Sequence, residues 1–295
     1  MSLNTCTTLI KKNMGISRCN KLPGKIVSMI TTPESFEIDA DTLVDQELLF
    51  AALNEAILEG QATRIYKWPD FVNMEQINKE AAYEDTAYSY LPIDDGQYRW
   101  KPSIRENLCI HRAMYTHRAN SGRIIAVDHL NQLFLTEKSN GAAAGFRIQT
   151  LNTEKLLLND GSVSTKSPIV IALKNNLEID KMGLLATLDS VGELYRIVDV
   201  AIEVVTVLAQ QIVVIVTAEC DGTAIEGLAH ADFILLTTAG VVQTINGFSE
   251  QGDGQYTLAK TSGSWLDGTL DLRPPSTLSL TPYELPEPVE IDIPS

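Results

Sequence analysis

The sequence predicts a mainly β protein of the α+β class: one helix flanks a larger β domain, and a small β-sandwich follows. Three observations lead to this prediction. Short runs of β-branched and aromatic residues, bounded by turn signals, recur along the chain. Only residues 42–59 show clear helical spacing, and between 209 and 273 strand-like runs and turns alternate about every ten residues.

The N-terminal part divides into an arm and a β-rich domain. Residues 1–24 are polar and rich in breakers, so we expect an arm; residues 25–208 form the β-rich domain. A first strand is expected over 25–31, and the helix over 42–59 is capped by Asp41 or Thr42 and ended by Gly60. Its expected buried side is Leu49, Ala52, Leu53, Ala56 and Ile57.

Further strands of this domain are expected on both sides of turn signals. Segments 83–93 and 97–104 flank the turn signal at 94–96 and predict a hairpin or a long protruding loop. A short helix follows within 105–118. The remaining strands are expected at 63–68, 123–127 with 132–136, 145–158, 167–173 and 197–208, the last of these closing the domain.

The C-terminal part is predicted to be a small sandwich over residues 209–273, followed by a tail. The sandwich strands are expected at 212–217, 233–237, 241–245, 256–259 and 270–272. Residues 274–295 hold six of the twelve prolines, at 274, 275, 282, 286, 288 and 294, mixed with acidic residues. Because proline cannot donate a ladder hydrogen bond, an extended, proline-rich acidic tail is expected.

Charge and cysteine usage limit the possible partners. Lys and Arg number 23 against 38 Asp and Glu, a net charge of −15, which disfavours tight DNA binding. An acidic surface can repel DNA that passes through a channel, or it can simply keep the protein soluble.

The four cysteines lie far apart, and no signal peptide with a basic region before an apolar one opens the chain. Four reduced thiols are therefore expected. No apolar run approaches the ~20 residues that a membrane span needs.

No pattern in the sequence singles out a catalytic or cofactor site. The phosphate-binding, dinucleotide-binding, nucleophile-elbow and zinc-protease motifs are all missing, so we expect a protein that is not an enzyme and holds no cofactor. Cys109, His111 and His117 form the best metal candidate, with His129 further on, but the second ligand pair of a zinc site is missing. We therefore expect no metal.

Aromatic residues crowd the region of the expected long hairpin: Tyr66, Trp68, Tyr83, Tyr88, Tyr90, Tyr98 and Trp100, beside several basic residues. Such a set is typical of a sugar- or base-stacking surface, or of cross-strand packing and a subunit interface. We favour the interface. Its candidate residues are Tyr88, Tyr90, Tyr98, Arg99, Trp100 and Arg105.

Two resemblances add to this reading. Segments 221–228, 231–233 and 252–258 (DGTAIEGL, ADF and GDGQYTL) resemble bacterial Ig-like modules of the invasin type. The resemblance implies an Ig-like β-sandwich with Leu228, Phe233 and Tyr256 in its core.

More faintly, segments 6–19, 64–71, 83–85, 95–99, 146–152 and 159–161 resemble virion structural proteins of tailed phages of Bacteroidetes-type hosts. This resemblance implies a tail-tube subunit: a β-sandwich or barrel with a flanking helix, self-assembling into stacked, hexameric rings around an acidic DNA channel. It implies other virion proteins as partners, DNA only as passing cargo, no membrane, and location in the virion after assembly in the host cytoplasm.

Other functions remain open from the sequence. A capsid decoration, head-fibre or head–tail connector protein would combine the same kinds of domain. A carbohydrate-binding adhesin would instead use the Tyr/Trp cluster.

Overall fold

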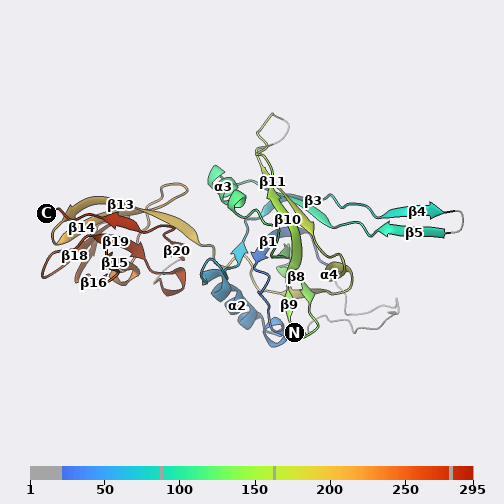
Figure 1. Ribbon diagram of the computed structural model, residues 1–295, viewed down its shortest axis with the longest axis horizontal. Helices are drawn as coiled ribbons and strands as arrows, with labels where there is room; N and C mark the ends of the chain where they lie inside the picture. Colours follow the sequence, from blue (N-terminus) through green and yellow to red (C-terminus); the bar gives the residue numbers. More distant parts are fainter. Residues whose placement is uncertain (1–21, 87–88, 162–163, 279–281, 295) are drawn as a thin grey trace. The chain divides into compact units, whose positions relative to one another are not determined.

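The computed structural model describes residues 22–86, 89–161, 164–278 and 282–294. The chain divides into two compact units: unit 1 comprises residues 1–57 and 61–194, and unit 2 comprises 58–60 and 195–295. Both units are built mainly of strands, which confirms the predicted mainly β class (Figure 1). The expected N-terminal arm, apart from Leu22–Gly24, lies outside the described residues.

Unit 1 is organised around a ten-stranded sheet of order β12-β8-β7-β10-β11-β6-β3, with β1 joined to β7 and β2, and β9 joined to β8. Its strands are β1 (Ile26–Thr32), β2 (Tyr66–Lys67), β3 (Phe71–Gln76), β6 (Arg99–Ile104), β7 (Arg123–Asp128), β8 (Gln132–Glu137), β9 (Ala143–Ala144), β10 (Phe146–Thr153), β11 (Ser167–Leu173) and β12 (Gly183–Thr187). The expected strands at 25–31, 123–127, 132–136 and 167–173 are thereby confirmed. The strand expected at 145–158 ends at Thr153, and the one expected at 63–68 is only the two residues of β2.

The middle of this sheet is buried on both faces. Ile124 and Ala126 of β7 belong to a core that also contains Trp100 and Phe146. Ile125 and Val127 of the same strand are 0% and 1% exposed. Since successive side chains of a strand point to opposite faces, both faces of β7 must be covered. The continuous apolar run of this strand follows from that double burial.

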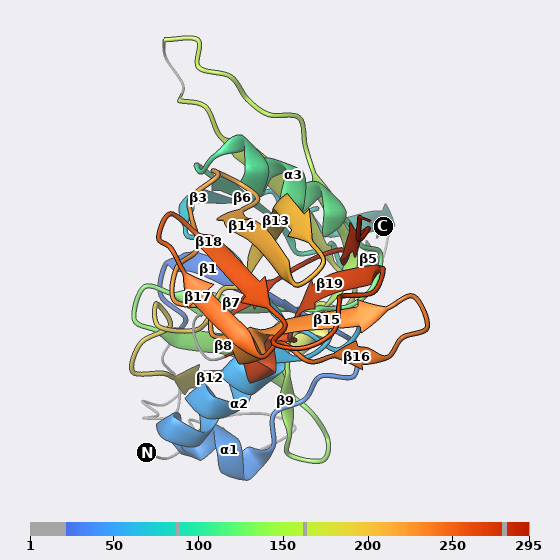
Figure 2. The ribbon, with the colours of Figure 1, turned by 90° about the vertical axis from the view of Figure 1, so that its left-hand side faces the viewer.

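The predicted helix is present but interrupted. Helix α1 (Ala40–Val44) and helix α2 (Gln46–Leu58) are separated by Asp45, whose backbone is extended. One carboxylate oxygen of Asp45 accepts hydrogen bonds from the backbone N–H groups of Glu47 and Leu48, at 3.0 and 3.2 Å. Asp45 is therefore the N-cap of α2, which the periodicity alone did not reveal. The buried residues of α2 include Leu49, Leu53 and Ile57, as expected; Figure 2 shows both helices.

Two shorter helices complete unit 1. Helix α3 (Leu108–Thr116) confirms the short helix expected within 105–118, and the Asn107 side chain caps it by accepting from the Ile110 N–H at 2.9 Å. Helix α4 (Leu177–Asp180) was not predicted from the sequence. Four residues are too few to show a helical period.

The turn between β7 and β8 is held by the buried carboxylate of Asp128. Its two oxygens accept hydrogen bonds from the backbone N–H groups of Leu130 and Gln132, at 2.8 and 2.9 Å, and of Gly24, at 2.8 Å. The residue is 1% exposed. It thus joins the predicted hairpin turn to the segment that precedes β1.

We expect Asp128→Ala to lower the free energy of unfolding by about 3 kcal/mol, because three backbone donors lose a charged acceptor. Urea denaturation followed by circular dichroism measures this. The control, Asp189→Ala, removes an exposed carboxylate and should change stability by less than ~0.5 kcal/mol. Equal effects of the two substitutions would contradict the role given to Asp128.

The long hairpin differs from the expected one. Its strands are β4 (Ala82–Thr86) and β5 (Ser89–Asp94), paired with each other in a separate two-stranded sheet. Ala82 pairs with Asp94 at the base of this ribbon, so the signal at Asp94–Gly96 marks the return to the main sheet rather than the hairpin tip. The carboxylate of Asp94 accepts from the Gly96 N–H at 2.9 Å, so the signal does form a local turn.

Unit 2 consists of two sheets. Their strands are antiparallel except at one edge, where β13 and β20 pair in parallel. One sheet has the order β17-β18-β14-β13-β20 and the other β16-β15-β19-β21. The strands are β13 (Val198–Leu208), β14 (Gln211–Ala218), β15 (Phe233–Thr237), β16 (Val242–Gln243), β17 (Gly247–Glu250), β18 (Gln255–Ala259), β19 (Gly268–Leu272), β20 (Tyr283–Glu284) and β21 (Val289–Ile291), with short 3₁₀ turns at His230–Asp232 and Pro275–Thr277.

Two boundaries expected from the sequence are wrong. Strand β13 was expected to close the first domain, but it pairs along its length with β14 and belongs to unit 2. The proline-rich tail is not a free arm, because β20 pairs with β13 and β21 pairs with β19. Its prolines lie outside these two short strands, where no ladder donor is needed.

The two sheets of unit 2 share one core. Leu228, Phe233 and Tyr256 are 2%, 4% and 0% exposed and all belong to it, as predicted. The Tyr256 hydroxyl donates to the Ile225 carbonyl at 2.7 Å and accepts from the Leu228 N–H at 3.2 Å. The ring is thus fixed at both its apolar and its polar end.

Candidate functional site: a projecting ribbon and a charged pocket

The first candidate feature is a ribbon formed by β4 and β5, which projects from the rest of unit 1 (Figure 1). No residue between Asp70 and Arg99 whose burial is described is buried. The described side chains of the ribbon therefore add nothing to the core. A two-stranded ribbon by itself is at best marginally stable in water.

The base of the ribbon is firmly attached to unit 1. Lys79 and Gln97 exchange two backbone hydrogen bonds of 2.9 and 3.0 Å. The Asn176 amide accepts from the Tyr98 N–H at 3.3 Å and donates to the Gly96 carbonyl at 3.0 Å. Gly96 has φ +75°, and a Cβ atom there would lie 2.4 Å from the Lys79 carbonyl oxygen. The direction in which the ribbon leaves the sheet is therefore set by specific contacts.

Of the residues expected to form an interface, Tyr90, Tyr98 and Arg99 lie on this ribbon or at its base, whereas Arg105 follows the far end of β6. Tyr88 lies outside the described residues, and Tyr90 lies in β5, where only the backbone is described. The Tyr98 hydroxyl donates to the Asp180 carboxylate at 2.5 Å. Arg99 is partly exposed and donates from Nε to the Gln97 side chain at 2.8 Å, while Arg105 is exposed.

The interface role expected for Trp100 is wrong. The residue is 4% exposed and packs in the core of unit 1, with its ring edge-on to Phe146 at a centroid distance of 6.2 Å. Trp68, at 2% exposed, lies in the same core. Both tryptophans of the aromatic set are therefore core residues, and neither can stack on a bound sugar or base.

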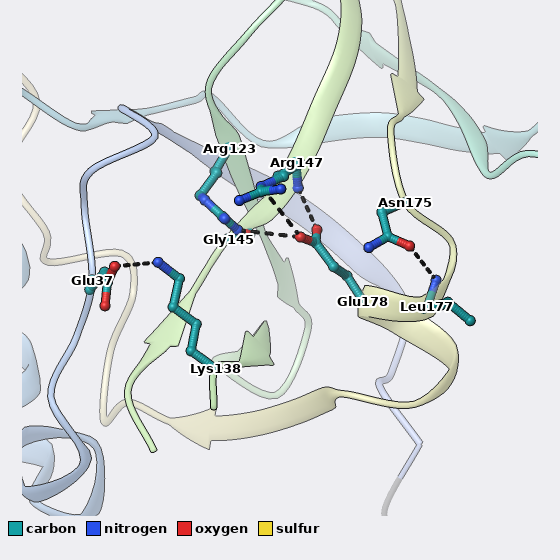
Figure 3. A network of polar contacts seen from close by, with 8 residues as sticks. All are labelled: Glu37, Arg123, Lys138, Gly145, Arg147, Asn175, Leu177 and Glu178. Carbon is teal, nitrogen blue, oxygen red and sulfur yellow. Dashed lines mark hydrogen bonds and ion pairs between the residues drawn. The ribbon is translucent and has the colours of Figure 1, made fainter. Parts of the chain in front are cut away.

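The second candidate feature is a network of charged side chains that sequence reasoning missed (Figure 3). Glu178 of α4 accepts a 2.7 Å hydrogen bond from the Arg147 N–H. Its other carboxylate oxygen lies 3.6 Å from Arg123 Nη1 and 3.8 Å from Arg147 Nε. Arg123 also donates to the Gly145 carbonyl at 2.7 Å. Beside this group, Lys138 and Glu37 form a further ion pair.

The side chains of this network are buried to different degrees. The side chains of Arg123 and Glu178 are 3% and 7% exposed, whereas that of Arg147 is 48% exposed. Burial lowers the pKa of Arg123, and the nearby Glu178 carboxylate opposes that effect. The hydrogen bond from Lys138 lowers the pKa of Glu37. In the sequence, this network is marked only by Arg123, a single arginine at the start of an apolar strand. Its partner Glu178 lies 55 positions further along the chain (178 minus 123).

A third local arrangement concerns Tyr98. Its hydrogen bond to Asp180, together with burial, raises the pKa of the phenol to about 12. Tyr98 is consequently a neutral donor at physiological pH, and it links the base of the ribbon to α4.

The cysteine expectation is wrong for two of the four residues. Cys109 and Cys220 are each disulfide-bonded, so they are not reduced thiols. A disulfide-bonded Cys109 also has no thiolate to offer a metal. Of the histidines near it, His111 contacts the Ser167 hydroxyl through Nδ1 at 2.8 Å, and the His117 ring lies edge-on to Tyr66 at 4.6 Å. Within the described ranges, no cluster of three or more His, Cys, Asp or Glu side chains is arranged to hold a metal ion.

In the part of the chain that the structure describes, no helix is long and apolar enough to cross a membrane. Comparison of the chain with protein-family models, with curated proteins and with solved structures gives no match.

Proposed function

We propose that this chain is a self-assembling structural protein of a tailed-phage virion, and specifically the tail-tube subunit. Copies of unit 1 form homo-oligomeric rings, and the rings stack around a channel through which DNA passes. Unit 2 is an Ig-like module appended to that assembly domain. The chain performs no catalysis in this role.

The observation that carries the proposal is the projecting ribbon. A two-stranded sheet outside the core, on a base fixed by Asn176 and Gly96, is costly to maintain unless a partner covers it. A second copy of the chain is the simplest partner. Strands β3 and β12, which end the main order of the unit 1 sheet, offer further edges for contact between copies.

Charge and the C-terminal unit support the same role. A net charge of −15 suits a surface past which DNA must move without binding. In unit 2, the Tyr256 hydroxyl is hydrogen-bonded to backbone groups at Ile225 and Leu228. Two sheets that share one core containing Leu228, Phe233 and Tyr256 are the arrangement of a β-sandwich, which supports the Ig-like assignment.

The experiment replaces residues 80–96 with Asn-Gly. Because Lys79 and Gln97 are a hydrogen-bonded pair, a two-residue turn can join them and remove the ribbon alone. We expect the wild-type chain to form rings or tubes in negative-stain electron microscopy. The shortened variant should keep the wild-type circular dichroism spectrum and stay monomeric.

Strictly monomeric behaviour of the wild-type chain at high concentration, together with absence from purified virions, would overturn the proposal. Immunogold labelling of virions tests the specific assignment. Labelled tails support the tube subunit, whereas label on capsids without tails would instead assign the chain to head decoration or the connector.

A further inference from the structure

A pocket of about 450 Å³ opens beside the charged network of unit 1. This volume is within the range of pockets that hold small molecules. Its walls come from the segment before α1, from β7, β8, β10, α4 and the loops beside them; the lining residues used below are Glu37, Arg123, Thr136, Lys138, Arg147 and Glu178. Figure 3 shows most of these side chains converging on one region.

The pocket contains cationic groups whose hydrogen-bonding capacity is incompletely used. Arg123 is 2% exposed, and its Nε has no hydrogen-bond partner in the described part of the chain. Arg147 Nε lies 3.8 Å from the Glu178 carboxylate, which is beyond hydrogen-bond distance. The Thr136 hydroxyl, on the adjacent wall, is also buried without a partner among the described residues. Donors left unsatisfied in this way cost free energy that an acceptor from outside would recover.

Two of the three carboxylates that line the pocket, Glu178 and Glu37, are already engaged. Glu178 accepts from the Arg147 N–H and lies between the two arginines, and Glu37 is held by Lys138. With Glu137, the lining contains three carboxylates against three cations, in a chain whose acidic residues outnumber its basic ones by 38 to 23. The cationic side chains at the pocket opening are Arg147 and Lys138, which are 48% and 25% exposed.

We propose that this pocket binds a small oxyanion. Its oxygen atoms would accept from the exposed guanidinium of Arg147 and the ammonium of Lys138. The unsatisfied Arg123 Nε and Thr136 hydroxyl, which line the same pocket, would be further donors to it. The shared chemistry is that of a phosphate or a carboxylate group. This site lies in unit 1, and its existence does not depend on the assembly role.

Thermal unfolding of the full chain tests the proposal. The wild-type protein is measured in increasing sodium phosphate, and separately in increasing sodium malonate, with sodium chloride holding the ionic strength constant. We expect a saturable rise in the midpoint temperature with at least one of the two anions, because a ligand that binds only the folded state stabilises it. Isothermal titration calorimetry of the same anion should give a saturable heat.

Three variants separate specific binding from the general effect of salts on stability. Arg147→Gln and Lys138→Gln should each lose the saturable part, whereas Arg112→Gln, at an exposed position on α3, should retain it. A response to phosphate alone identifies a phosphate-bearing ligand, and a response to malonate alone identifies a carboxylate. If Arg147→Gln and Arg112→Gln respond identically to both anions, or the wild type gives no saturable response, the proposal is wrong.

Discussion

Replacing Glu178 with alanine is expected to lower the free energy of unfolding of this protein by about 3–5 kcal/mol. The side chain of Glu178 is 7% exposed and lies 3.6 Å from Arg123, which is itself 3% exposed. Removing the carboxylate leaves a buried guanidinium without its counter-charge. It also removes the acceptor for the Arg147 N–H. Because arginine does not lose its proton at accessible pH, the cost cannot be avoided by neutralisation.

Denaturant unfolding of the purified chain measures this effect. Glu178→Gln keeps an oxygen that can accept from the Arg147 N–H, so its cost should lie between those of wild type and Glu178→Ala. Glu106→Gln, at an exposed position, should stay within ~0.5 kcal/mol of wild type. A stability of Glu178→Ala equal to that of Glu106→Gln would show that Arg123 does not depend on Glu178.

Replacing Trp100 with alanine should likewise cost about 3–5 kcal/mol, because it opens a large cavity in the core of unit 1. Trp100 is 4% exposed and packs beside Phe146. The sequence suggested an interface role for this residue. The two roles differ in their readout: a core residue affects unfolding of the monomer, whereas an interface residue affects association.

The neighbouring Tyr98→Ala variant provides the comparison. It removes the hydrogen bond to Asp180 at the base of the ribbon and a ring that is only partly buried against the same core, so we expect a smaller cost, of about 1–2 kcal/mol. Unfolding is measured at a concentration at which the chain is monomeric. If Trp100→Ala unfolds like wild type but fails to associate, the core assignment of Trp100 is wrong.

Local patterns predicted most of the individual strands. The turn at residues 128–131 was readable because Asp128 holds it through bonds to residues two and four positions away. The helix was readable from its apolar spacing, which matches a buried side formed by Leu49, Leu53 and Ile57. The cap at Asp45 was missed, since Asp41 and Thr42 further upstream are also residue types that cap helices.

Assignments that depend on partners distant in sequence could not be made in this way. The strand at Val198–Leu208 has the same composition whichever domain it joins, and its pairing with β14 decides the boundary. The tail was interpreted from its prolines, but β20 and β21 are fixed by strands 85 and about 20 positions earlier. Likewise, a tryptophan at position 100 fits either a core or a surface position, and only the strands that cover it decide between the two.

The sequence by itself thus determined the mainly β class, the positions of most strands, the acidic charge and the core residues Leu228, Phe233 and Tyr256. The class, the strands and the charge follow from composition and from short-range periodicity, which local backbone geometry imposes directly. The three core residues follow from the resemblance to Ig-like modules. Only the tertiary structure decided the route of the projecting ribbon, the domain membership of β13 and the tail, and the network of Arg123, Arg147 and Glu178. Each of these depends on contacts between residues far apart in the chain, and no local pattern encodes which distant partners meet.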